Sequence, residues 1–538
     1  MKAVRLRTEY LENPIGIDIV APRLYWNAEG GTKQTAYQII AKSGGKITWN
    51  TGKVASSRMT HILYEGQPLH SREKVYWSVK LWDENGEGGE ISTGSFEMGL
   101  LENTDWEAKW ITGNYKVKKS ERYPVDCFRK HLSITREVKS ARLYITACGL
   151  YEARLDGEKI GNFCLAPGHT DYRKRVQYQT YDVTELLSVG DHTMTVQLAD
   201  GWYRGSTGAW GLRNQYGTET KLLAQLEITY ADGKQTAIVT DESWDWSNDG
   251  PIRFADNKDG EVVNANREPS YSGKAKVTSY TVMPTASNNV PVTEHERFTP
   301  AVSKSPNGKW LLNFGQNIAG YISFRIQAKE GQLLTFRFGE LVDADGNLTL
   351  KNIQCTSKEK ASPLQQIIYT CREGLNEYKT TFAVFGFQYA EVETDIELQP
   401  ENVTAFAIYS DIEQKGFFES SNELLNRFVE ATIWSTKGNS LDIPTDCPTR
   451  ERHGWTGDAQ IFFETANYLF DYAAFSQKYL RDVYDWQKKD GKLPQIAPEG
   501  GVDFYMKFMD GSVGWADAGV VMPYTLWKQY GDIQILRK

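Results

Sequence analysis

One segment of the chain, residues 441–458, gathers side chains that could do chemistry. Within 18 residues it holds four carboxylates, two arginines, a histidine, a cysteine and a tryptophan, and its prolines and glycines prevent a regular helix. A charged surface loop is usually richer in lysine, serine or asparagine. The composition favours a functional site, and the alternative is a helix-connecting loop with a structural network of ion pairs.

Two kinds of chemistry suit carboxylates beside a tryptophan. In glycoside hydrolysis, one carboxylic acid donates a proton to the leaving oxygen, and a second carboxylate activates water or attacks carbon. In sugar binding alone, carboxylates accept hydrogen bonds from hydroxyl groups while the indole stacks on the ring. The spacing along the chain leaves both possibilities open.

The elements that position this segment are predicted to be helices. Ser420 and Glu423 have the spacing of a capping box, and apolar residues recur behind them at helical intervals. Three more helices are predicted over 458–470, 472–488 and 515–530, the last ended by Gly531.

Before these helices, up to about residue 412, the hydrophobic period is two. The run 75–81 alternates apolar and polar residues and is followed by a turn at 83–86, and similar short runs recur. This pattern predicts antiparallel β-sandwiches. Polar stretches at 114–124 and 284–306, in which little secondary structure is expected, divide the β portion. The predicted domains are listed in order: sandwiches at 1–112, 125–283 and 295–412, and a helical domain at 413–538.

Composition excludes several classes of protein. The 538 residues are too many for one domain, and the net charge of −8 is spread without a basic cluster, which argues against a nucleic-acid partner. The N-terminus lacks an apolar stretch of signal-peptide length, and no later stretch could span a membrane, so we expect a cytoplasmic chain without a membrane partner. The six cysteines lie far apart and predict reduced core thiols. The oligomeric state cannot be predicted.

The motif at 446–460, DCPTRERHGWTGDAQ, resembles the signature of the bacterial α-L-rhamnosidases, glycoside hydrolase family 78. Four further stretches resemble that family in its own order: 21–37, 157–205, 313–340 and 514–518. The resemblance implies an Ig-like or fibronectin-III-like module, a carbohydrate-binding-type sandwich, a concanavalin-like sandwich and the start of an (α/α)6 barrel. The substrate would be a rhamnose-containing glycoside or polysaccharide.

The resemblance also implies roles for individual residues. Glu451 corresponds to the general acid of an inverting hydrolysis, and its carboxyl group would need a raised pKa, supplied by Trp455 or a neighbouring carboxylate. Six residues would bind substrate or position the acid: Asp446, Arg450, Trp455, Asp458, Trp515 and Asp517. No cofactor is required for catalysis.

Several of these residues, and their neighbours in the motif, also have a purely structural interpretation. Trp515 and Asp517 are predicted to open a helix, where an acidic first turn is common. One of Arg450 and Arg452 is expected to pair with a carboxylate as scaffold, while His453 is expected to be structural and Cys447 to be a small buried residue.

Calcium is possible in the second β domain. By resemblance, Asp200 lies in a region that coordinates calcium and rhamnose in some relatives, and 256–261 is rich in acidic residues. That stretch lacks EF-hand spacing, and a solvated turn is the favoured interpretation.

An inverting site also needs a second carboxylate that activates water, and no residue of this sequence matches the one in the family. In the family it lies in later helices, and the local carboxylates Glu464, Glu499, Asp503 and Asp510 do not match it. We expect the chain to be an inactive N-terminal fragment of a longer rhamnosidase, with apolar barrel faces exposed. The alternatives are a noncatalytic multi-β carbohydrate-binding protein with a vestigial helical end, or another (α/α)6 enzyme, including a phosphorolytic one.

Overall fold

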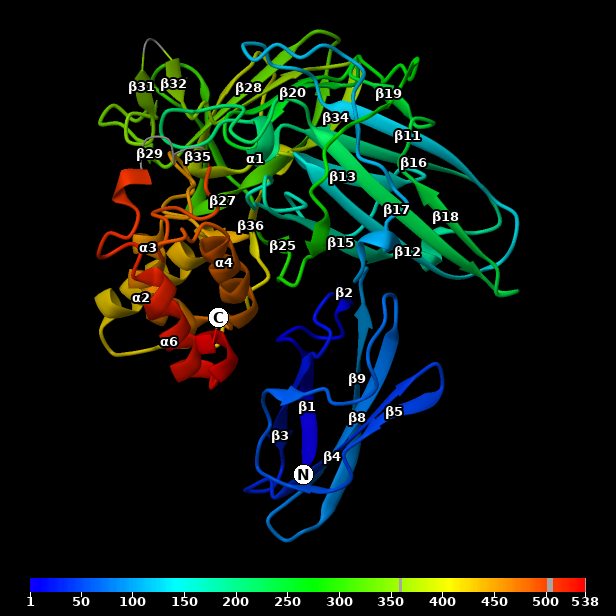
Figure 1. Cartoon of the computed structure of the whole chain (residues 1–538). Coiled ribbons are helices and arrows are strands. Elements are labelled where there is room, and N and C mark those ends of the chain that lie inside the picture. Colours follow the sequence, from blue (N-terminus) through cyan, green and yellow to red (C-terminus); the bar gives the residue numbers. More distant parts are fainter. Residues whose placement is uncertain (358–359, 501–506, 538) are drawn as a thin grey trace.

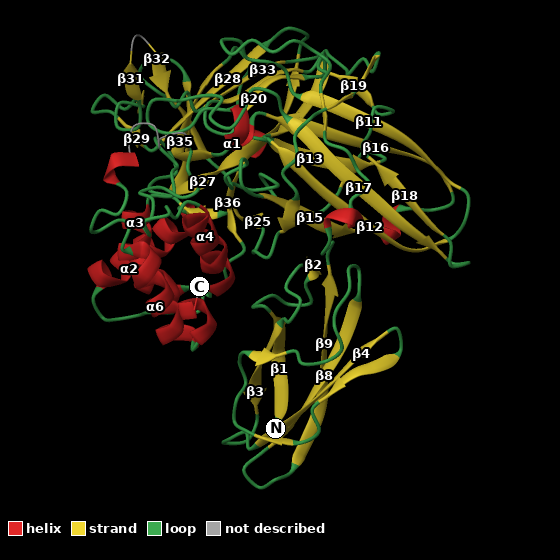
Figure 2. Ribbon diagram, in the orientation of Figure 1, coloured by secondary structure: helices red, strands yellow, loops and turns green. Residues whose placement is uncertain are grey.

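The computed structural model describes residues 1–357, 360–500 and 507–537. It shows several β regions followed by a helical region (Figures 1 and 2), so the chain is multidomain and mostly β. Within the described ranges, no helix has the length and apolar character needed to cross a membrane.

The first β region has two sheets and a hydrophobic core of its own around Trp26 and Trp77. One sheet contains β1 (Lys2–Thr8), β3 (Arg23–Glu29) and β7 (Ile62–Leu63). The other runs β2 (Ile15–Ile17), β9 (Gly88–Met98), β8 (Lys74–Trp82), β4 (Ala36–Ser43) and β5 (Lys46–Asn50), with β6 (Val54–Ala55) on β4. In β8, alternate residues are buried, as the period of two predicts.

The second β region also has two sheets. One runs β23 (Lys276–Val277), β10 (Ile111–Thr112), β17 (Lys221–Tyr230), β12 (Val138–Cys148), β15 (Val176–Asp182) and β24 (Pro284–Ala286), with β18 (Gln235–Val239) on β17. The other runs β14 (Glu158–Lys159), β13 (Leu150–Leu155), β16 (Gly190–Ala199), β11 (Asp126–Ile134), β19 (Asp245–Ser247) and β22 (Gly273–Lys274). A short helix, α1 (Gly201–Arg204), follows β16.

The third β region is one continuous ten-stranded sheet rather than two separate sheets. Its path is β20 (Ile252–Asp256), β21 (Gly260–Asn264), β33 (Gln366–Thr370), β28 (Leu333–Gly339), β35 (Phe385–Glu393), β27 (Trp310–Ala328), β36 (Val403–Ser410) and β25 (Val292–Phe298), with β26 (Ala301–Lys304) and β34 (Gly374–Lys379) on β27. The sheet is continuous because the 19-residue β27 pairs with β35 on both sides of a register shift, with β26 before the shift, and with β36 and β34 after it.

In the described residues, three short hairpins and five 3-10 turns complete the β and helical regions. The hairpins are β29 (Leu341–Val342) with β30 (Leu348–Thr349), β31 (Cys355–Ser357) with β32 (Lys360–Ser362), and β37 (Ser440–Leu441) with β38 (Ile443–Pro444). The turns are η1 (Asn103–Asp105), η2 (Thr184–Leu186), η3 (Pro400–Asn402), η4 (Lys507–Met509) and η5 (Ile533–Arg537).

Two features of the β portion differ from the sequence-based expectations. The strands β20 and β21 fall inside 125–283, yet they hydrogen-bond into the third sheet through the parallel pair β21–β33. The stretch 284–306, expected to be poor in structure, contains β24, β25 and β26. A strand with one solvated face can be rich in polar residues, so a polar composition does not exclude strands. The pairs β2–β9 and β15–β24 are also parallel, which a purely antiparallel prediction misses.

The helical region contains α2 (Glu423–Gly438), α3 (Thr456–Leu469), α4 (Ala473–Asp485) and α6 (Ala518–Tyr530). Gly531 follows α6 with φ 71°, the left-handed end that the sequence predicts. The predicted cap of α2 is wrong. Asn422 caps it, because its side chain accepts hydrogen bonds from the backbone of Leu424 and Leu425, whereas Ser420 bonds to Asn426.

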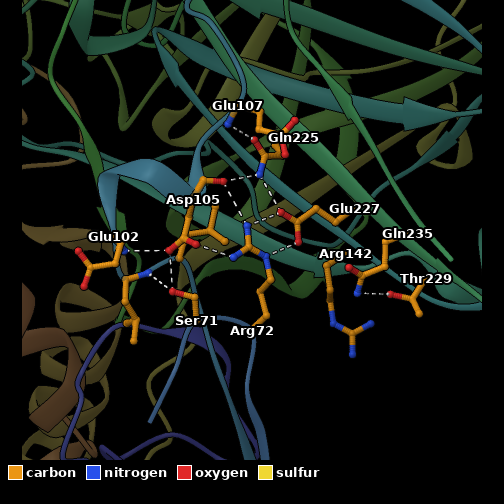
Figure 3. Close-up of polar contacts among 12 residues, drawn as sticks. Ser71, Arg72, Glu102, Asp105, Glu107, Arg142, Gln225, Glu227, Thr229 and Gln235 are labelled. Atoms are coloured by element: carbon orange, nitrogen blue, oxygen red, sulfur yellow. Dashed lines mark hydrogen bonds and ion pairs between the residues drawn. The ribbon is translucent and has the colours of Figure 1, made fainter. Parts of the chain in front are cut away.

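The second and third β regions and the helices share one hydrophobic cluster, and the first region joins them through ion pairs. Arg72, with φ 67°, donates to Asp105 and to Glu227 on β17, each at 2.6 Å (Figure 3). Arg142 on β12 reaches Glu97 of the first region at 2.7 Å. On the helical side, buried Arg23 pairs with Asp532 at 2.8 Å. These contacts hold the first region against both neighbours.

The helices carry an exposed apolar face, and we predict that it makes the chain self-associate. Phe428 on α2 is 66% exposed, Ile461 on α3 81% and Val520 on α6 71%. Exposed apolar faces of this kind promote association in water. Light scattering should show mass rising with concentration, and the double variant Phe428→Glu, Ile461→Lys should reduce the rise. Ile91→Lys, at a similarly exposed position of the first region, should not. A chain that stays monomeric at every concentration would contradict this prediction.

Candidate active site

Of the carboxylates of the 441–458 segment, Asp446 and Glu451 lie between the hairpin β37–β38 and helix α3, while Asp442 is at the turn of the hairpin and Asp458 is in the first turn of α3. Gly454 has no room for a side chain, because a Cβ there would lie 1.9 Å from the carbonyl oxygen of Ala497. Trp455 then forms the N-cap of α3. Tight packing at Gly454 therefore fixes where the loop ends and α3 begins.

A cavity of about 490 Å³ opens beside this segment. Its walls come from the end of α2, the loop 439–446, one side of α3, Tyr472 and the turn before α6. Three predicted site residues line it: Asp446, Asp458 and Trp515. The volume is in the range of small-molecule sites.

The Trp515 indole packs against the first turn of α3, at Gly457. A Cβ at Gly457 would lie 2.7 Å from the indole nitrogen of Trp515, so glycine permits this close packing. The indole remains 39% exposed. It provides a flat apolar surface in the cavity that Asp446 and Asp458 also line.

The three other predicted site residues of the loop, Arg450, Glu451 and Trp455, form a second group. The indole N–H of Trp455 donates to the Glu451 carboxylate at 2.9 Å, and the Arg450 guanidinium lies 3.4 Å from its other oxygen. The Glu451 backbone N–H donates to the Cys447 sulfur at 3.2 Å. Glu451 is thus held by the turn that precedes it and by the indole four residues later.

The two groups are coupled electrostatically. Burial, reinforced by the charges of Glu451 and Asp458, raises the pKa of Asp446 to about 6, although Asp446 Oδ1 also accepts a 2.9 Å hydrogen bond from the His453 backbone. Burial and the charge of Glu451 also raise the pKa of Asp458. Glu451 therefore lies near both aspartates, and the carboxyl group poised to titrate near neutral pH is Asp446.

Asp517 lies apart from this arrangement. Its carboxylate accepts a 2.8 Å hydrogen bond from the Gly514 backbone at the start of α6, and it does not line the cavity. The helix begins only at Ala518, so Trp515 precedes it rather than opening it.

One of Arg450 and Arg452 was expected to pair with a carboxylate, and Arg452 is not that one. It is buried, and instead of a carboxylate it binds backbone carbonyls, including those of Asn257 at 2.7 Å and Val384 at 2.6 Å. Burial lowers its pKa to about 10. The residue that pairs with a carboxylate is Arg450. Cys447 is half-buried rather than fully buried.

The acidic stretch 256–261 is not a solvated turn. Asp256 and Asp259 are buried at the junction of the second and third β regions, where Ser206 donates to both, at 2.7 Å in each case. Arg122 pairs with Asp259. Asp200 likewise forms an ion pair with Arg204 at 2.6 Å. Among the residues that the structure describes, no group of three or more histidine, cysteine or acidic side chains is arranged to hold a metal ion.

Comparison with known protein families covers nearly the whole chain. Residues 3–102 match the Rha78A-like N-terminal immunoglobulin domain, and 136–304 the α-L-rhamnosidase N-terminal domain. Residues 303–409 match the bacterial α-L-rhamnosidase concanavalin-like domain, and 413–538 the six-hairpin glycosidase domain of the same enzymes. The chain belongs to the bacterial α-L-rhamnosidase family.

Individual α-L-rhamnosidases agree with this membership. A curated relative from Alteromonas sp. is 34% identical over 97% of this chain and 59% of its own length, and one from Formosa agariphila is 32% identical over 99% and 60%. The crystal structure of the Streptomyces avermitilis α-L-rhamnosidase with L-rhamnose superimposes with a TM-score of 0.92, at 27% identity, covering 100% of this chain and 69% of that one. The chain thus spans about 60% of the length of the curated relatives.

Sequence reasoning missed the part of the cavity that comes from α2 and α4. In this rhamnosidase-family chain, Thr436, Ser440 and Tyr472 also line the cavity, and the Ser440 hydroxyl lies 2.8 Å from that of Tyr472. Thr436 is on α2, Ser440 on β37 and Tyr472 at the N-cap of α4, so they meet only in the folded chain and no local motif marks them.

Proposed function

We propose that this chain carries the sugar-binding and proton-donating part of an α-L-rhamnosidase site. The observation that supports this most is the cavity lined by Asp446, Asp458 and Trp515, with Glu451 beside it. Carboxylates that accept hydrogen bonds from hydroxyl groups, together with a flat indole, suit a sugar ring. The helical region that contains the cavity also belongs to the glycosidase part of the family, which disfavours a noncatalytic binding protein.

In the proposed reaction, Glu451 protonates the glycosidic oxygen of a terminal α-L-rhamnoside. The Trp455 indole N–H donates a hydrogen bond to Oε2 of the same carboxyl group and so fixes the orientation of that group. Asp446 and Asp458 would hold the sugar hydroxyls, and Trp515 would cover one face of the ring. Arg450 would balance the charge of Glu451 when the proton has left, and Asp517 would hold the turn that carries Trp515.

Inversion also requires a second carboxylate, about 6.5–9.5 Å from the acid, to activate water. The carboxylates that the sequence offered are engaged elsewhere: Glu464 with Lys528, Glu499 with Arg173 and Asp510 with Lys488. Asp503 lies outside the described residues. We therefore propose that these 538 residues, which would form part of an (α/α)6 barrel, bind rhamnose without hydrolysing rhamnosides.

An assay with 4-nitrophenyl α-L-rhamnoside tests this proposal. We expect no release of nitrophenol by the chain, in buffer or in phosphate, together with saturable binding of L-rhamnose. Turnover that Glu451→Gln abolishes would refute the lack of activity but support Glu451 as the acid. Turnover of methyl α-L-rhamnoside, whose leaving oxygen must be protonated, that survives Glu451→Gln would refute the assignment of the acid. A sugar phosphate formed in phosphate buffer would favour a phosphorolytic enzyme.

A further inference from the structure

The Trp210 side chain is mostly exposed to solvent and contributes little to the hydrophobic core. Of the tryptophans in the described part of the chain, it has the largest exposed fraction, 61%. The residues before it, 201–208, are all buried. An isolated exposed indole on a well-packed base is a common element of binding sites, because it offers a large apolar surface at little entropic cost.

Trp210 lies in a short hairpin, residues 207–212, that follows α1. Helix α1 is surrounded by strands and loops (Figure 2). Thr207 and Leu212 close the hairpin with two backbone hydrogen bonds of 2.8 and 2.9 Å. Gly208 and Gly211 have φ values of 65° and 57°, which only glycine adopts readily. The two glycines therefore allow the tight turn that lifts Trp210 off the surface.

The base of this hairpin is fixed against the loop that holds Glu451. A Cβ at Gly208 would lie 2.6 Å from His453 Nε2, so the hairpin backbone touches the His453 ring. The Gly208 carbonyl accepts a hydrogen bond from buried Lys258, and the Thr207 hydroxyl donates to the Gly500 carbonyl at 3.1 Å. Burial lowers the pKa of His453 to about 3, so the ring is a neutral packing surface at this junction.

Chain geometry limits the distance between Trp210 and the acid. Trp210 is two positions from Gly208, and Glu451 is two positions from His453, so each pair of Cα atoms spans at most about 7 Å. The indole reaches several ångströms further. Through the close contact of Gly208 with His453, the Cα atoms of Trp210 and Glu451 lie within about 20 Å of each other. Trp210 is on a different element from those that line the cavity.

We propose that Trp210 is the stacking surface for the part of the substrate on the leaving-group side of the scissile bond. This inference rests on the proposed function, in which the cavity takes the rhamnose ring and Glu451 faces the glycosidic oxygen. The leaving group must then lie outside the cavity, next to the acid, and the second β region supplies an exposed indole within about 20 Å of it. The ligand class is a ring with an apolar face, either an aromatic aglycone or a second sugar.

Calorimetry with thioglycosides, which resist hydrolysis, tests this inference. The probes are L-rhamnose, methyl 1-thio-α-L-rhamnoside, its 4-nitrophenyl analogue and a thio-linked rhamnosyl-glucose disaccharide. Trp210→Ala should weaken binding of the nitrophenyl probe, the disaccharide or both about five- to tenfold, and Trp210→Phe should restore most of it. Binding of L-rhamnose and the methyl probe should stay within twofold. Trp527→Ala, at an exposed tryptophan on α6, should change nothing.

The outcomes separate the two proposals. If Trp210→Ala leaves all four affinities unchanged, or weakens all four equally, the role of Trp210 is refuted while rhamnose binding stands. If the unaltered chain binds neither L-rhamnose nor any thiorhamnoside, the proposed function fails and the role of Trp210 fails with it. Which ring probe responds shows whether the stacked ring is aromatic or a sugar.

Discussion

Replacing Lys478 with methionine should lower the free energy of unfolding of the helical region by about 3–5 kcal/mol. The Lys478 ammonium is buried on α4 and contacts Asp442 Oδ2 at 2.6 Å, Asp482 Oδ2 at 2.9 Å and the carbonyl oxygen of His169 at 2.5 Å. Methionine fills similar space but leaves two buried carboxylates without this cation. Since Asp442 also accepts a hydrogen bond from the His169 backbone, the variant should loosen the second β region from the helices.

Urea unfolding followed by circular dichroism at 222 nm measures this change. Lys492→Met is the matched control, because Lys492 pairs with Asp490 at 2.9 Å where both side chains are more than half exposed. Exposed pairs of this kind contribute about 0–1 kcal/mol. A loss below about 1 kcal/mol in Lys478→Met would contradict the account of this buried charge network.

The second large effect is expected at Asp446, where function and stability should oppose each other. The folded protein binds the Asp446 proton more tightly than the unfolded chain, because burial raises the pKa from 3.8 to about 6. Stability from this group is therefore fully present below about pH 4 and is lost as the pH rises to about 6. Asp446→Asn should be more stable than the unaltered chain by about 1–3 kcal/mol at pH 7.5, and the two should converge at pH 4.

The same variant should bind L-rhamnose at least about tenfold more weakly at pH 7.5, because a neutral amide replaces a charged acceptor. The affinity of the unaltered chain should fall as the pH drops through about 6, and that step should be absent from Asp446→Asn. Calorimetry between pH 4.5 and 8 would measure both. An affinity independent of pH, or a variant that is less stable at pH 7.5, would refute this role of Asp446.

The fold was predictable where a local pattern determines the structure. The alternation in β8 and the stop at Gly531 depend on neighbouring residues, and the structure confirms both. The joining of β21 to β33 could not be predicted, because parallel pairing brings together residues about 100 positions apart and leaves no local signal. The cap at Asn422 was missed because three nearby side chains compete for the same role.

The candidate site was predictable as a segment but not as a cavity. The motif brought Asp446, Glu451 and Trp455 together on one loop. The walls supplied by Ser440 and Tyr472 follow from helix packing. The burial of Asp256 and Asp259 was missed because an acidic turn looks solvated until the partners that bury it are known, and those partners, Arg122 and Ser206, lie far away in sequence.

The most direct test of the central claim is a crystal structure of this chain soaked with L-rhamnose. We predict one rhamnose ring in the cavity, with its hydroxyl groups within hydrogen-bond distance of Asp446 and Asp458 and one face against Trp515. An empty cavity at saturating sugar, or rhamnose bound only at a site away from these three residues, would contradict the account.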